Sequence, residues 1–147
     1  MEATTIQKII NEFDTFFKAH KGIKSFRVSP ITDFTNEKYP LVWLDVQKIN
    51  GNYKGGSKMF NFPLYFFSKI PIDYTDTALI KSLSDAEILL DNTYSYFAQN
   101  KDKFNFVINA DPTTEPVMLE FQDFVAGYLA NFQIRTAAFR NETIIPV

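Results

Sequence analysis

Residues 57–69 constrain the fold of this chain more than any other segment does. Their side chains alternate along the whole segment, which predicts one long β-strand. Every second residue over 60–66 puts an apolar side chain on one face, while Tyr65 and Phe67 put aromatic rings on the other. Because both faces are partly apolar, we expect protein to cover this strand on both sides. Pro63 cannot donate a ladder hydrogen bond, so we expect it at a bulge or an edge.

The N-terminal segment has the period of a helix. Its isoleucines and phenylalanines from Ile6 to Phe17 form one stripe of a 3.6-residue period. Thr4 or Thr5 is suited to cap the first turn, and Gly22 is suited to end the helix in the left-handed conformation. We therefore expect an N-terminal helix that packs on the sheet.

The longest helix is expected after Pro71, over about residues 75–100. Thr75 or Asp76 is its first candidate cap, while Ser84, with a glutamate three residues later, offers a later start. The apolar stripe of this helix contains Leu79, Leu83, Ala86, Leu90, Thr93 and Phe97, widened by Ile80, Ile88, Leu89 and Tyr94.

Shorter strands complete the expected sheet. They lie at residues 24–28, 41–49, 104–109, 117–121 and 127–138. Glycine-rich residues 50–56 join two strand-like segments, so we interpret them as a hairpin loop. The order of one helix, three strands, a long helix and three strands favours antiparallel pairing. It predicts an α+β fold with a mainly antiparallel sheet, a long β-hairpin and two packed helices, in one domain over residues 1–147.

Composition excludes several kinds of catalytic and metal site. The chain has no cysteine, which removes thiolate nucleophiles, zinc knuckles and iron–sulfur clusters. Its one histidine, His20, could combine only with Asp14, Asp33 and a nearby serine, and it lies where a helix ends. We therefore expect a solvated helix-end histidine. A net charge of -2 argues against a nucleic-acid surface, which is usually basic. We expect no enzyme, no cofactor and no metal.

The carboxylate pairs and the glycine-rich segment of the chain match no ion-binding or phosphate-binding motif. Glu87 and Asp91 share one helix stripe, so a solvated face is the preferred interpretation. The glycine-rich residues 50–56 match neither of two phosphate-binding patterns, G-x-x-x-x-G-K-[ST] and G-x-G-x-x-G. We therefore interpret them as a mobile hairpin tip or as an interaction loop. Three further pairs lie close in sequence but match no calcium-binding loop, namely Asp73 with Asp76, Asp85 with Asp91, and Glu115 with Glu120.

Aromatic residues make up 16% of the chain, and this enrichment has two interpretations. Most large rings belong to a hydrophobic core, because each buries a large apolar area. Aromatic enrichment with few charges is also typical of the buried centre of a protein interface. Composition alone leaves open a core only, or a core combined with an oligomer interface.

Several segments resemble small virion proteins of tailed phages that infect Bacteroidetes, including the crAss-like phages. The segments are residues 39–44 (YPLVWL), the aromatic strand 60–67 with its acidic turn 71–73 (PID), the helical residues 83–91 (LSDAEILLD), and residues 132–135 (FQIR) and 145–147 (IPV). The similarity covers about residues 39–147, and the N-terminal helix fits by position.

The resemblance implies a tail-terminator or neck-ring subunit. Such folds have an N-terminal helix, a sheet with a long hairpin and a second helix packed on the sheet. The resemblance also implies a closed ring, a hexamer or a dodecamer, in the virion between portal and tail, assembled in the host cytoplasm. Its partners would be other copies of the chain and neighbouring portal, neck or tail proteins. DNA would pass through the lumen only as cargo, no membrane would be involved, and no active site is implied.

A closed ring needs two different contact surfaces on each subunit. We expect the two-faced aromatic strand to supply one and residues 139–147 to supply the other, with the hairpin loop 50–56 reaching an adjacent ring or subunit. The expected contact residues are Tyr53, Lys54, Tyr65, Phe67, Phe139, Ile144 and Ile145.

The aromatic residues also support an alternative function. The chain would then be a small binding module that holds an apolar lipid or metabolite between the long helix and the sheet. Its pocket would be lined by Phe60, Phe62, Phe66 and Tyr94. A small enzyme built around His20 is a third possibility, supported by that residue alone.

Overall fold

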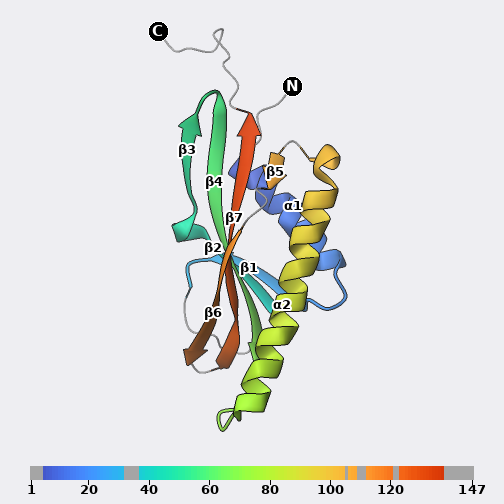
Figure 1. The fold of residues 1–147 in the computed structure, drawn as a ribbon, viewed down its shortest axis with the longest axis vertical. Coiled ribbons are helices and arrows are strands. Elements are labelled where there is room, and N and C mark those ends of the chain that lie inside the picture. The colour runs from blue at the N-terminus through green and yellow to red at the C-terminus, as the bar shows by residue number, and fades with distance from the viewer. Residues whose placement is uncertain (1–4, 32–36, 105, 109–111, 121–122, 138–147) are drawn as a thin grey trace.

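Two helices cover one face of a seven-stranded, mostly antiparallel sheet in the part of the chain that the computed structural model describes (Figure 1). The described residues are 5–31, 37–104, 106–108, 112–120 and 123–137. The α+β fold expected from the sequence is confirmed. In chain order the elements are α1 (Ile6–Ala19), β1 (Ser25–Ser29), β2 (Leu41–Asp45), the 3-10 turn η1 (Val46–Lys48), β3 (Asn50–Lys54), β4 (Ser57–Lys69), α2 (Asp76–Gln99), the 3-10 turn η2 (Lys101–Lys103), β5 (Phe106–Ile108), β6 (Thr113–Glu120) and β7 (Phe124–Ala137).

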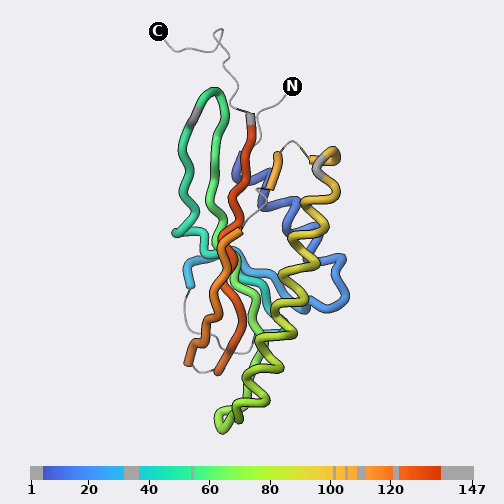
Figure 2. Tube along the Cα trace, viewed as in Figure 1, coloured from blue at the N-terminus to red at the C-terminus, as the bar shows by residue number. Residues whose placement is uncertain are grey.

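The centre of the sheet is one long antiparallel pair. β4 and β7 pair without interruption from Ser57 opposite Ala137 to Lys69 opposite Val125. β2 and β3 pair with successive parts of β4, and β6 and β5 pair with successive parts of β7. β1 extends the sheet beside β2 in parallel. The chain trace in Figure 2 shows the β3–β4 hairpin at one end of the long axis and the start of α2 at the other.

The prediction of one strand over residues 41–49 is wrong. β2 ends at Asp45, whose Oδ1 accepts a hydrogen bond from the backbone N–H of Gln47 and so caps the turn η1. β3 then begins within the segment 50–56 that was expected to be a loop, and it pairs with β4. Only Gly55 and its neighbour Gly56 remain as the turn, with φ angles of 56° and 81°. Four strands therefore separate the helices instead of three.

Pro63 lies at a local edge of the sheet, which is one of the two positions expected for it. On one side it faces Asn131 of β7 in an unbroken register. On the other side it lies between Leu64, where the pairing with β2 ends, and Asn61, where the pairing with β3 begins. The change of partner strand thus falls where a proline removes a donor.

The first hydrophobic core lies between the helices and the sheet. Phe13 of α1 is completely buried at its centre, and its ring centroid is 4.8 Å from Phe97 of α2 and 6.0 Å from Phe62 of β4. Phe132 of β7 completes this contact at 6.4 Å. Burial of each such ring contributes roughly 1.5–3 kcal/mol, so these contacts hold both helices to the long strand pair.

A second core covers the opposite face of the sheet, as the two-faced strand requires. Leu41, Trp43, Phe67 and Val125 are all completely buried there. The residues packed over them are Ile31, Tyr39, Tyr65, Val117 and Leu119. The guanidinium carbon of Arg27 also lies 4.5 Å from the centre of the Trp43 ring. The expectation that protein covers both faces of β4 is therefore confirmed.

Threonines begin both helices. The Thr5 hydroxyl accepts from the backbone N–H of Lys8 at 3.3 Å, and the Thr75 hydroxyl accepts from that of Ala78 at 3.1 Å. Thr75 is thus the observed cap of α2, and Ser84 lies inside the helix instead of starting it. The left-handed ending expected at Gly22 is wrong, because α1 ends at Ala19 and its capping residue His20 is extended, with φ of -81°.

Replacement of Gly127 by alanine should strongly destabilise the fold. A Cβ atom at this position would lie 1.6 Å from the backbone oxygen of Phe66, so β4 and β7 would have to separate where Phe67 pairs with Gly127. We expect Gly127→Ala to lower the free energy of unfolding by about 3 kcal/mol or more, measured by urea denaturation. Gly55→Asn is the control, because nothing lies within 4 Å of a Cβ atom there and asparagine tolerates positive φ. Equal stability of Gly127→Ala and the native chain would contradict the observed strand spacing.

Candidate functional site

His20, the one imidazole of the chain, has a structural role. Its Nδ1 accepts a hydrogen bond from the Gly22 N–H at 3.0 Å, so a neutral ring carries its proton on Nε2. Nε2 lies 3.3 Å from the side-chain nitrogen Nδ2 of Asn92 on α2. The helix-end position is confirmed, but the ring is half-buried and joins α1 to α2. Its expected partner Asp14 binds Lys18 instead, at 2.8 Å, and Asp33 lies outside the described residues.

The carboxylates form no metal site among the residues that the structure describes. No group of three or more histidine, aspartate or glutamate side chains in that part of the chain is arranged to hold an ion. Glu87 and Asp91 are exposed on α2, as a solvated helix face requires, and Asp85 pairs with Lys81 at 2.9 Å. Neither α1 nor α2 has the length and apolar character that crossing a membrane would need.

The hairpin places one expected contact residue in solvent. Tyr53 of β3 is 75% exposed, and the Lys58 Nζ lies 5.7 Å from the centre of its ring. The side chain of Lys54 lies outside the described part of the chain. Tyr53 and Lys58 together present an aromatic, basic surface at the hairpin end of the molecule (Figure 1).

Tyr65 and Phe67, expected as contact residues, are not free surface residues. Phe67 is completely buried in the second core, so the expectation that it contacts a neighbouring subunit is wrong. Its ring packs inside the chain. Tyr65 is half-buried, with its ring stacked on Phe67 at 5.4 Å. Phe139, Ile144 and Ile145 lie outside the described residues.

The space that an apolar ligand would need is filled by side chains. Phe62 and Phe66 are completely buried in the first core, and the Phe66 ring lies 6.2 Å from Phe17 of α1. Tyr94 of α2 stacks on Phe132 at 6.5 Å. Phe62 and Phe66 therefore belong to the core between the long helix and the sheet, where the alternative function places its pocket, and Phe60 and Tyr94 pack against that core.

Exposed isoleucines are the feature that sequence reasoning missed. Ile72 is 76% exposed in the loop before α2, and Ile80 and Ile88 on α2 are 62% and 58% exposed. The last two were expected to widen the buried stripe. The spacing along α2 could have indicated this exposure. Ile88 lies two residues after buried Ala86, which places it about 200° around the helix from the buried side. A residue so placed faces away from the sheet.

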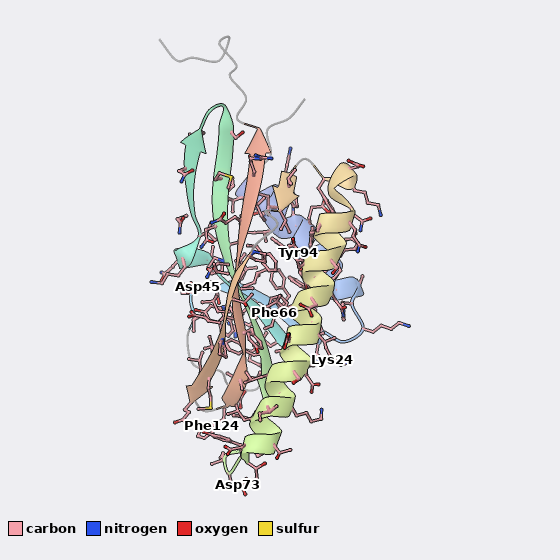
Figure 3. The ribbon with its side chains drawn as sticks, viewed as in Figure 1. Lys24, Asp45, Phe66, Asp73, Tyr94 and Phe124 are labelled. Carbon is pink, nitrogen blue, oxygen red and sulfur yellow. The ribbon has the colours of Figure 1, made fainter. Side chains whose placement is uncertain are left out.

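Two of these isoleucines lie beside acidic side chains. We define the acidic isoleucine surface as Ile72, Asp73, Asp76 and Ile80, all of which are exposed. Figure 3 places Asp73 at the end of the molecule where α2 begins. The thirteen residues of β4 run between this end and the hairpin, a span of about 40 Å at about 3.3 Å per residue. The acidic isoleucine surface and Tyr53 thus lie at opposite ends of the protein.

A buried polar contact lies on the second core. The Tyr39 hydroxyl donates to Asp123 Oδ2 at 3.0 Å, and the Lys69 Nζ lies 3.6 Å from the other carboxylate oxygen. Burial, followed by the hydrogen bond to Asp123 and the charge of that group, raises the pKa of Tyr39 well above its usual range. Burial also raises the pKa of Tyr65, with smaller contributions from the charges of Asp45 and Glu115.

A scan against protein-family models finds no match, and a search of the curated proteins finds no similar sequence.

Alkaline pH should destabilise the protein through Tyr39. Its folded-state pKa is raised, so its contribution to stability is complete below about pH 10 and is lost as the pH rises beyond that value. We expect the free energy of unfolding to fall between about pH 10 and pH 12. The fall should be shallower in Tyr39→Phe and unchanged in the exposed control Tyr53→Phe, as measured by denaturant titration at each pH. Identical slopes for all three proteins would contradict the buried phenol–carboxylate contact.

Proposed function

We propose that this chain is a non-enzymatic structural subunit of a phage virion. It assembles into a ring in the neck, connector or tail-terminator region between portal and tail. The single observation that carries the proposal is the exposure of Ile72 and Ile80, at 76% and 62%, on one acidic surface. Large apolar side chains that are clustered and exposed are typical of surfaces that a partner covers. The resemblance of the sequence to neck and tail proteins supports the virion location.

The strength of one such contact favours a closed assembly. Burial of two isoleucine side chains contributes roughly 3–6 kcal/mol, whereas association costs about 4–15 kcal/mol in lost freedom of motion. One contact by itself is therefore weak. In a closed ring each subunit makes two contacts, and the last subunit closes the ring without a further association cost.

The hairpin end of the subunit is separate from the acidic isoleucine surface. The acidic isoleucine surface and the Tyr53–Lys58 surface differ in chemistry and lie at opposite ends of β4. A neighbour in the ring can therefore cover the acidic isoleucine surface through the heterologous contact of cyclic rings without using the hairpin. The hairpin is then free to reach a portal, neck or tail protein in the next layer. The net charge of -2 suits a lumen through which DNA passes as cargo.

Lysines in place of the two isoleucines should abolish assembly. Ile72→Lys/Ile80→Lys removes the apolar contact and opposes it with charge, whereas both positions are solvated in the single chain. We expect the mass from sedimentation velocity to fall from that of a closed oligomer to that of the 17.0 kDa chain. Gln99→Lys, exposed at the far end of α2, should leave the oligomer intact.

Two results would contradict the proposed function. The first is a native chain that remains monomeric at the concentrations used for assembly. The second is its absence from purified virions, tested by mass spectrometry of the particles.

A further inference from the structure

A lysine-rimmed hollow lies between the end of α1 and β1. Its volume is about 360 Å³. Figure 3 places Lys24, one of its lining residues, at the flank of the molecule beside the middle of α2. We call this hollow the lysine groove, and its lining residues are Phe17, Lys18, Ile23, Lys24, Ser25 and Phe26.

The lysine groove combines an apolar floor with a basic rim. Phe17 and Ile23 are 1% and 7% exposed, so they belong to the core and form a firm floor. Lys18 and Lys24 are exposed at the rim. With Lys21 they give residues 18–24 three positive charges and no carboxylate. Asp14 offsets part of this charge through its contact with Lys18, whose side chain remains 74% exposed. The groove therefore suits a ligand that is both apolar and anionic.

The acidic isoleucine surface has the complementary chemistry. Residues 72–80 contain two aspartates and no basic residue, a net charge of -2. The next residue, Lys81, is paired with Asp85. The chain thus presents an apolar, acidic surface and an apolar, basic groove at different places.

The two surfaces of one chain cannot meet each other. His20, at the end of α1, contacts Asn92 of α2, which fixes the groove beside the middle of that helix. Ile80 lies twelve residues earlier on the same continuous helix, about 18 Å away at about 1.5 Å per residue. A contact between the two surfaces therefore joins separate copies.

We infer that the lysine groove receives the acidic isoleucine surface of a second copy of this chain. This inference rests on the proposed function, and it identifies the lateral contact of the assembly. An isoleucine enters the hollow against Phe26, and Asp73 and Asp76 approach the lysines at its rim. Because the contact joins the end of one subunit to the flank of the next, it repeats with a rotation, as a ring requires.

Charge reversal tests this pairing directly. Lys18→Glu/Lys24→Glu makes the groove acidic, and Asp73→Lys/Asp76→Lys makes the donor surface basic. Each variant alone opposes like charges, so we expect its apparent association constant to fall at least tenfold in sedimentation velocity. In an equimolar mixture each groove meets a donor of opposite charge, and we expect the native association constant to return. The native contact should also weaken as salt rises from 0.05 to 0.5 M.

Matched controls separate this pairing from a general effect of charge. Lys48→Glu/Lys103→Glu and Glu115→Lys/Glu120→Lys make the same charge changes at exposed positions elsewhere and should assemble normally. Circular dichroism melting verifies that every variant is folded. A native oligomer that survives both reversals, or a mixture that does not recover, overturns the pairing but leaves the proposed function standing. A monomeric native chain overturns both.

Discussion

The continuous pairing of β4 with β7 is the interaction on which the rest of the structure depends. It aligns Phe62 with Phe132 beneath the helices and Phe67 with Gly127 on the opposite face, so one ribbon supports two cores. Gly127 permits the close approach beside Phe67, where a Cβ atom would overlap the Phe66 carbonyl. The shorter strands divide the two outer sides of this ribbon between them, and both helices pack on one of its faces.

This arrangement changes which apolar residues are available for contact. The phenylalanines, which suggested an interface from composition, are mostly used inside the chain, and Phe67 is completely buried. In the part of the chain that the structure describes, the most exposed aliphatic side chains are instead Ile72, Ile80 and Ile88, on or near α2, because that helix packs on the sheet through only one side. Ring burial stabilises the subunit, and the isoleucines remain for a partner. A proposed assembly contact therefore follows from the orientation of α2 more than from the aromatic content.

His20 and the charged side chains near the helix ends make structural contacts or flank apolar surfaces. His20 uses Nδ1 to hold the end of α1 and lies beside Asn92 of α2, and so its ring acts as a link between helices. The lysines after α1 rim an apolar hollow, and the aspartates before and within the first turn of α2 flank the isoleucines. The charged groups of these two regions are complementary, which gives the proposed ring a specific lateral contact.

The sequence by itself determined the elements whose signals are local. Helical periodicity and the threonine caps located both helices, and the alternation over residues 57–69 required two covered faces, because side-chain direction follows directly from backbone period. Only the tertiary structure decided what depends on neighbours distant in the chain. The capping by Asp45 ended one expected strand four residues early. The His20 ring lies close to the position that a Cβ atom of residue 22 would take, which favours glycine there. Sheet packing determined which side of α2 was buried. Exposure of Ile80 and the existence of the lysine groove belong to this second group, since each is a property of how separate elements meet.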